Sequence, residues 1–315
     1  MTYSVGSTIL RDDYNIFATG AANGSATNSG NVNNLWGTGN SQYGWGQSTT
    51  INSVSAGGQI TASQWSTLTS RINSIRSHQT GSGVTFTNTT GGATSNFTAG
   101  QTIYQVSNLS SALSSAYTAA NTASATTGSM AAYSTSAYAA ATVNSKTISN
   151  STTTTFNFSV ALGSYDQMRY FFNTGGYLEF TCSMVNTGTS KTQSWSNLAS
   201  DIGTVRFGGL ASVYSGYSGV WNTNTNYYLY NAPGTKTLWW KKYNDTGIAD
   251  YNLNYVQCSL YLSGSTLYFE LVTSDAAADT FNDTIDNPFV WNCQAFQAGT
   301  SYVTNTWSTI TITAS

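Results

Sequence analysis

The chain has 315 residues, of which only 7% are charged; 10 Lys and Arg against 12 Asp and Glu give a formal net charge of −2. Nucleic-acid binding and polybasic membrane anchoring both need clustered Lys and Arg, so this composition excludes both classes. The hydrophobic fraction of 40% and the aromatic fraction of 14% suffice for a sizeable core. No run of apolar residues is long enough for a transmembrane helix, and the first residues do not form a secretory signal.

Residues 1–58 are rich in Gly, Asn, Ser and Thr and show no long helical or strand periodicity. Aromatic residues are sparse there, at Tyr14, Phe17, Trp36, Tyr43 and Trp45. This pattern predicts a loop-rich arm that packs on a neighbour, in the same chain or in another subunit. A small loop-rich domain is the alternative.

Residues 61–78 carry the clearest helical pattern of the chain. Thr61 and Gln64 form a capping-box pair, and Gly81 offers a left-handed stop. An apolar stripe follows at helical spacing: Trp65, Leu68, Ile72 and Ile75. We interpret this stripe as an attachment helix. His78, the sole histidine, lies in the last turn, where a helix-dipole partner or a surface residue is a commoner role than catalysis.

The sequence divides into three regions. Residues 1–101 are predicted to be an N-terminal attachment region, and residues 102–145 a short helix followed by an Ala/Ser/Thr-rich linker. A helix packed closely against identical neighbours is the alternative for that linker. Residues 146–315 are predicted to form a C-terminal domain.

Alternating residues at 155–162, 177–184, 255–262, 267–272 and 310–313 predict strands in this C-terminal region, and residues 170–172 are assigned to a further strand. Ser263, Gly264 and Ser265 predict a hairpin turn. The predicted fold class is therefore mainly β: a C-terminal antiparallel β-sandwich, jelly-roll-like, preceded by the loop-rich arm and one or two short helices.

Catalytic constellations are weak in this sequence. A serine triad needs a histidine base, and zinc needs closely spaced His and Cys ligands, which one histidine and three scattered cysteines do not provide. We therefore expect no enzyme and no cofactor. Cys182, Cys258 and Cys293 lie in strand-like surroundings and are expected to be reduced, mostly buried thiols.

Two clusters remain as candidate sites. Four acids follow a predicted strand and offer oxygen ligands for Ca²⁺, with solvated loop acids as the alternative: Asp275, Asp279, Asp283 and Asp286. An aromatic-rich stretch spans residues 214–243 and reads as core, as a subunit interface or as a glycan-binding surface. Its candidate glycan contacts are Trp221, Trp239, Trp240 and Tyr243.

Several strings resemble virion structural, tail-fibre-like proteins of tailed bacteriophages, especially contractile-tailed cyanophages. They are GSTILRDDYN at 6–15, ITASQWSTL at 60–68 with HQTG at 78–81, RYFFNTGG at 169–176, Trp195, GTVRFG at 203–208, and KYNDT at 242–246 with the acidic stretch ending at Asp286. The resemblance implies a non-enzymatic virion component and carries no catalytic residues with it.

This resemblance implies a tail fibre or a fibre-like tail or baseplate protein, assembled in the host cytoplasm and resident in the virion. The alternatives are a neck, collar or head-decoration fibre and a host-recognition adhesin that binds surface glycan. The expected partners are further copies of the chain, as a homotrimer, and other tail, neck or baseplate proteins. An enzyme acting on envelope polysaccharide lacks the acid–base set that it would need.

Overall fold

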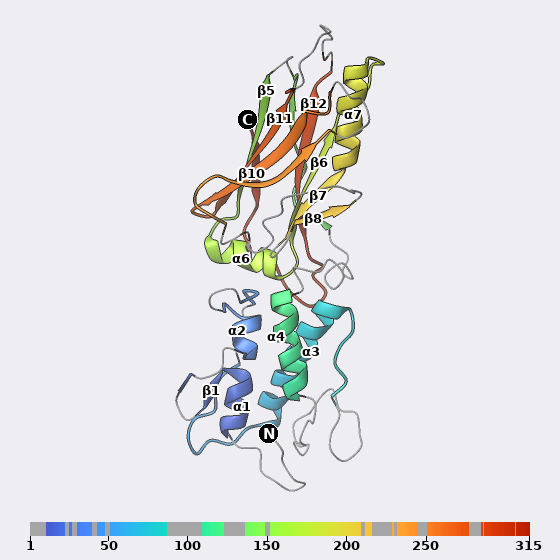
Figure 1. Ribbon diagram of the computed structural model, residues 1–315. Helices are drawn as coiled ribbons and strands as arrows, with labels where there is room; N and C mark the ends of the chain where they lie inside the picture. Colours follow the sequence, from blue (N-terminus) through green and yellow to red (C-terminus); the bar gives the residue numbers. More distant parts are fainter. Residues whose placement is uncertain are drawn as a thin grey trace. The chain divides into compact units, whose positions relative to one another are not determined.

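The computed structural model describes residues 11–22, 25–26, 30–39, 43–47, 51–86, 109–122, 136–148, 152–208, 212–215, 229, 232–244, 251–276, 285, 287–305 and 307–315. The chain forms two compact units (Figure 1). The helical unit comprises Met1–Ser134, Arg169–Thr174 and Ala298–Thr306. The sandwich unit comprises Thr135–Met168, Gly175–Gln297 and Trp307–Ser315. Both units are therefore assembled from segments that lie far apart in the sequence.

The helical unit contains four helices and one short ribbon among its described residues. The helices are α1 (Arg11–Ala18), α2 (Val32–Trp36), α3 (Ala62–Thr80) and α4 (Leu109–Thr122); β1 (Ala21–Ala22) pairs antiparallel with β2 (Ser25–Ala26). They enclose one hydrophobic core, which includes Tyr14, Leu35, Trp36, Trp45 and Phe86. The described part of residues 1–58 therefore packs on α3 and α4 of the same chain, one of the two kinds of partner predicted for the loop-rich arm, but it contains α1 and α2, which were not predicted.

Helix α3 confirms the helix predicted at residues 61–78. The Thr61 side chain accepts a hydrogen bond from the Gln64 N–H, and the Gln64 side chain accepts one from the Thr61 N–H, which completes the capping box. Gly81 ends the helix in the left-handed conformation at φ 74°, which glycine adopts without steric cost.

Helix α4 confirms the short helix predicted within residues 102–145. Its inner face contributes Leu109, Ala112, Leu113 and Ala116 to the core of the helical unit. Buried Gln79 of α3 donates a hydrogen bond of 2.8 Å to the Ala116 carbonyl and ties the two helices together. Residues 109–122 are thus part of the helical unit, while residues 123–135 lie outside the described residues.

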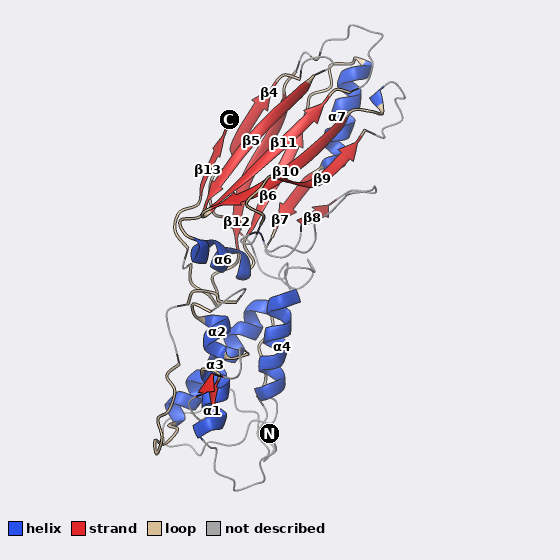
Figure 2. Cartoon of the chain, turned by 60° about the vertical axis from the view of Figure 1, so that its left-hand side comes forward, coloured by secondary structure: helices blue, strands red, loops and turns tan. Residues whose placement is uncertain are grey.

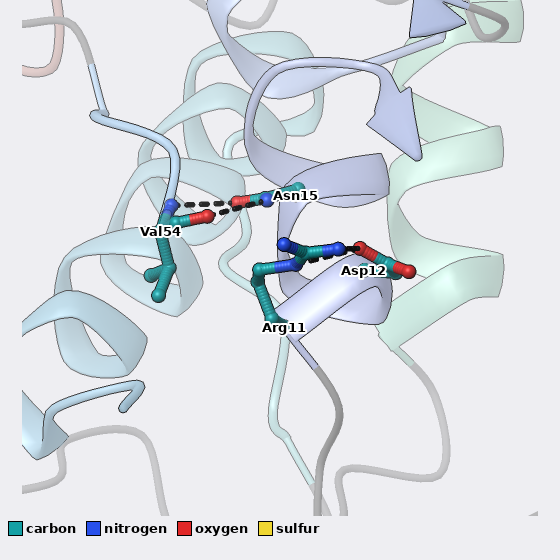
Figure 3. A network of polar contacts seen from close by, with 4 residues as sticks. All are labelled: Arg11, Asp12, Asn15 and Val54. Carbon is teal, nitrogen blue, oxygen red and sulfur yellow. Dashed lines mark hydrogen bonds and ion pairs between the residues drawn. The ribbon is translucent and has the colours of Figure 1, made fainter. Parts of the chain in front are cut away.

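Asparagine side chains of α1 and α2 hydrogen-bond the backbone of residues 51–54, a segment that belongs to no helix or strand. Asn15 donates to the Val54 carbonyl at 3.0 Å and accepts from the Val54 N–H at 2.8 Å (Figure 3). Asn33 makes the same pair of bonds with Ile51, at 2.7 and 2.8 Å. Each amide satisfies both backbone groups of one residue, so we call these contacts amide clamps. They explain how an Asn-rich, weakly periodic sequence folds compactly.

Segments from the second half of the chain complete the helical unit. Gln47 clamps Thr304, donating to its carbonyl at 2.9 Å and accepting from its N–H at 2.8 Å. Arg169 donates to the Thr38 carbonyl at 2.8 Å. An N-terminal deletion therefore removes packing partners of residues 169–174 and 298–306 as well as the N-terminal helices.

The sandwich unit contains two antiparallel sheets, which confirms the mainly β fold and the C-terminal sandwich (Figures 1 and 2). The five-stranded sheet has the order β13-β5-β11-β10-β9, and the six-stranded sheet has the order β3-β12-β6-β7-β8, with β4 also paired to β12. Their bounds are β3 (Ser136–Ala137), β4 (Thr142–Lys146), β5 (Thr153–Ala161), β6 (Tyr177–Ser183), β7 (Thr204–Phe207), β8 (Ser212–Ser215), β9 (Thr237–Tyr243), β10 (Tyr255–Ser263), β11 (Thr266–Ser274), β12 (Phe289–Gln297) and β13 (Thr311–Ala314).

The strand order contains two meanders, β6-β7-β8 and β9-β10-β11. A jelly roll is built from Greek keys, so these meanders do not confirm the jelly-roll-like detail of the prediction. The predicted hairpin is present: Ser263 pairs with Thr266, and Gly264 turns the chain at φ 60°. Strands β3 and β4 begin the sandwich inside the region predicted as a linker.

Aromatic side chains join the two sheets. Phe180 of β6 packs against Phe158 of β5 at 5.5 Å and against Phe269 of β11 at 4.8 Å between ring centroids. Phe207 of β7 lies 5.1 Å from Phe269. These residues occupy the inward positions of alternating strands, so the period-2 pattern of the sequence does locate the core.

Two helices of the second half were not expected. Helix α6 (Tyr165–Asn173) replaces the strand predicted at residues 170–172, and helix α7 (Ser190–Ile202) packs against β6. Ser164 and Thr189 stand at their N-terminal ends, and each side chain accepts a backbone N–H three residues on. These two residues are the sequence signal that the strand interpretation missed.

Candidate functional site

The predicted tryptophan surface does not form. Trp239 and Trp240 of β9 are 1% and 0% exposed and belong to the sandwich core, so neither can stack on a glycan. Two consecutive strand residues normally point to opposite faces. Here Cys258 of β10 faces Trp240 while the next residue, Ser259, faces Leu238. Trp239 is the additional residue of a β-bulge, which explains why both indoles are buried. Trp221 lies outside the described residues.

Of the three predicted glycan contacts that the structure describes, Tyr243 alone lies on the surface, with half of its area exposed. It pairs with Tyr255 of β10, and the two rings lie 5.7 Å apart. The Lys241 ammonium sits 3.4 Å from the Tyr255 ring centroid and 4.5 Å from that of Tyr243, so it makes cation–π contact with both.

A second tyrosine pair lies on the same outer face of the five-stranded sheet. Tyr261 and Tyr268 face each other across β10 and β11 and stack at 4.7 Å with an interplanar angle of 7°. Tyr255 and Tyr261 are six residues apart on β10, about 20 Å at 3.3 Å per residue. We call these two pairs and Lys241 the tyrosine face. Tyr255, Tyr261 and Tyr268 were missed because periodicity alone does not separate outer from inner aromatics.

The first of the four predicted calcium ligands, Asp275, is buried and is not part of a surface site. Asp275 follows β11 and its carboxylate lies 2.8 Å from the Lys191 ammonium, with both side chains fully buried. This carboxylate is paired with a cation inside the protein and is not an open ligand of a surface loop. Asp279, Asp283 and Asp286 lie outside the described residues. Among the described residues, no group of three or more His, Cys, Asp or Glu is arranged to hold a metal ion.

Asp275 belongs instead to a buried polar row at one end of the sandwich. Tyr255 of β10 pairs with Ser274 of β11 on one side and with Tyr243 of β9 on the other. The next inward residues beyond these pairs lie side by side at the ends of the three strands: Asp275, Asn254 and Asn244. All three are at most 3% exposed. The Asn244 N–H donates to the Asn254 carbonyl at 2.8 Å.

The first turns of α7 cover this row. Lys191 of α7 pairs with Asp275, and Ser194 accepts a hydrogen bond from the Asn244 side chain. Thr189 caps the helix by accepting from the Thr192 N–H at 3.1 Å, which fixes the turn that carries Lys191. Sequence reasoning missed this cluster because α7 itself was not predicted.

The predicted attachment stripe is internal. Trp65, Leu68, Ile72 and Ile75 are 4%, 0%, 0% and 0% exposed and pack into the core of the helical unit. These four side chains cannot contact another protein while the unit stays folded. The helical stripe was correctly identified, but its partner is the chain's own N-terminal region.

His78 is also internal, in contrast to the predicted surface or dipole role. Its Nε2 lies 2.7 Å from the Thr174 carbonyl, which can only accept, so Nε2 carries the proton. Its ring packs edge-on against Trp45 at 4.9 Å. Burial lowers the pKa of His78 to about 4, with the Thr174 bond acting in the opposite direction. The imidazole is therefore neutral at pH 7 and holds residues 169–174 in the helical unit.

The three cysteines are free thiols, as expected. Cys258 and Cys293 are buried and Cys182 is partly buried. Burial raises the pKa of all three thiols, so they are poor nucleophiles at neutral pH.

Comparisons of the chain with protein families, curated proteins and solved structures gave no match. None of the described helices has the length and apolar composition needed to cross a bilayer.

Proposed function

We propose that the chain is a non-enzymatic structural component of a bacteriophage virion, a tail fibre or a fibre-like tail or baseplate protein. The alternative is a fibre of the neck, the collar or the head decoration. The proposal rests on the resemblance of its sequence strings to such proteins, together with one structural observation: the exposed side of α4 in the helical unit and the outer side of β5 and β13 in the sandwich unit carry small uncharged side chains.

The exposed side of α4 carries that observation. Its inner face is apolar, while its four exposed positions before residue 116 are all serine: Ser110, Ser111, Ser114 and Ser115. The outer side of β5 and β13 is similar, with Asn157, Thr311 and Thr313 exposed. Charged side chains cost more than small polar ones to desolvate in a subunit contact. Such faces suit a protein whose surface is covered on assembly.

The use of the ionisable groups supports a structural role. His78 is held neutral inside the helical unit, and Lys191 and Asp275 pair inside the sandwich unit. Each of these groups has its partner inside the fold, at a place that solvent and substrate do not reach.

We propose that the chain assembles as a homotrimer with other tail, neck or baseplate proteins as neighbours, and that the serine side of α4 is one of its contacts. Ser110→Glu with Ser114→Glu places two charges on that side. We expect this variant to fold normally and to be depleted at least tenfold from purified particles, as measured by quantitative mass spectrometry.

A matched control separates contact from folding. Ser63→Glu adds a charge at an exposed position in the first turn of α3 and should leave incorporation unchanged. Equal incorporation of the α4 variant and the control would contradict the α4 contact. Sedimentation of the purified chain as a monomer at high concentration would contradict self-assembly.

A host-recognition adhesin is the second candidate, and the tyrosine face favours it. The exposed ring of Tyr243 and the half-buried rings of the other three tyrosines, with Gln257 and Asn157 on the same side of the sheet, offer stacking surfaces and hydrogen-bonding groups for a saccharide. We expect Tyr243→Ala to weaken the binding of the full-length chain to host envelope polysaccharide by tenfold or more. The midpoint of denaturant unfolding of this variant should be unchanged. Unchanged binding would remove glycan contact from this face.

A further inference from the structure

The buried pair of Lys191 and Asp275 contains every atom needed to form an amide bond. The Nζ and Oδ2 atoms lie 2.8 Å apart, and neither side chain is exposed. We propose that the two side chains condense into an intramolecular isopeptide cross-link between α7 and the end of β11. The inference concerns a covalent modification and is independent of the proposed station in a virion.

Amide formation uses the neutral forms of both groups. An amine attacks only when it is neutral, and a carboxyl group loses its oxygen only when it is protonated. Removing an ammonium and a carboxylate from water penalises both charges. Transfer of one proton from Nζ to the carboxylate gives a neutral amine beside a neutral acid without any exchange with solvent.

The condensation balances without a further reactant. The Nζ lone pair attacks Cγ of Asp275 and forms the new C–N bond. The bond from Cγ to the protonated oxygen then breaks, and that oxygen leaves as water with its own proton and one from nitrogen. Nζ keeps one hydrogen as an amide N–H, and no atom is oxidised or reduced.

Both reacting groups are held in place by rigid elements. Lys191 lies in the first turn of α7, whose N-terminus is capped by Thr189. The Asp275 N–H donates to the Thr152 carbonyl at 3.0 Å, which fixes the end of β11 beside β5. Holding two reacting groups together in this way raises their effective concentration, which reaches about 10⁵ M or more in well-oriented intramolecular reactions.

The buried polar row suits both the reaction and its product. Asn254 precedes Tyr255 and Asp275 follows Ser274, the residues that pair at this end of β10 and β11, so the Asn254 amide is near enough for us to assign it as a hydrogen-bond donor to the developing oxyanion. The product exchanges two buried charges for one neutral amide, and neutral amides are cheaper to bury than ions. Water has little access to reverse the reaction.

Intact-mass spectrometry of the purified, denatured full-length chain tests this inference. We expect the wild-type chain to be lighter than its sequence by one water molecule. The difference in mass between wild type and Asp275→Ala should equal the substitution plus one water. Lys191→Met should likewise have its full sequence mass. Proteolysis of the wild type should release a branched peptide that joins Lys191 to Asp275.

Lys236→Met is the matched control, because Lys236 pairs with Glu270 on the surface, where half of the Lys236 side chain is exposed. This variant should still be one water lighter than its sequence. A wild-type chain at its full sequence mass overturns the proposal. A loss of water that persists in Asp275→Ala or Lys191→Met also overturns it. Because the wild-type mass decides, a variant that fails to fold does not weaken the test.

Discussion

Replacing Asn15 by alanine tests whether amide clamps hold the helical unit together. The Asn15 side chain is buried and makes two hydrogen bonds to Val54, at 3.0 and 2.8 Å (Figure 3). Its removal leaves the N–H and the carbonyl of Val54 without these partners, at about 1–3 kcal/mol for each buried group. Because Val54 is 7% exposed and some water can reach it, we expect a total loss of about 2–4 kcal/mol.

Arg11→Ala on the same helix provides the control. Arg11 pairs with Asp12 at 2.7 Å, but the two side chains are 28% and 29% exposed. Partly exposed pairs of this kind contribute less than about 1 kcal/mol. The two variants thus compare a buried amide with a solvated ion pair on one short helix.

Amide hydrogen exchange measures the difference where it arises. The Val54 N–H should exchange about 30- to 1,000-fold faster in Asn15→Ala than in the wild type, and less than about fivefold faster in Arg11→Ala. Equal effects of the two substitutions, or an unchanged rate at Val54 in Asn15→Ala, would refute the clamp.

Three further predictions concern stability. The folded-state pKa of His78, about 4, lies below its ordinary value of 6.5. The contribution of His78 to the free energy of unfolding is therefore complete above pH 6.5 and is lost as the pH falls towards 4. Acid titration of the helical unit should show a loss of about 3 kcal/mol that is absent in His78→Gln. Trp240→Ala should cost the sandwich unit about 3–5 kcal/mol in denaturant unfolding, whereas exposed Tyr243→Ala should cost less than about 1 kcal/mol. Thr61→Ala should destabilise the first turn of α3 by about 1 kcal/mol, seen as faster exchange of the Gln64 amide; no change there would argue against the cap.

Local chemistry made part of the fold predictable. The capping pair of Thr61 and Gln64 located α3, and alternation of apolar residues located β5, β6, β10, β11 and β13, because both signals act within a few neighbouring residues. The glycine at position 264 correctly marked the β10–β11 hairpin.

Interactions between distant segments account for the errors. Asn15 and Asn33 look like loop residues until the partners at Val54 and Ile51 are known. The adjacent Trp239 and Trp240 are both internal only because of a bulge opposite Cys258, which no periodicity reveals. Asp275 appeared to belong to an acidic loop because its partner, Lys191, is 84 residues away (275 − 191).

The location of the chain in purified phage particles tests the proposed function most directly. We predict that the gene for this chain lies in a phage genome and that proteomic analysis of the corresponding particles will find the chain at a fixed copy number. An electron-microscopy map of the same particles should then place a helical unit and a two-sheet sandwich unit in the tail, baseplate or neck. Abundant chain in infected cells but none in purified particles would contradict the assignment.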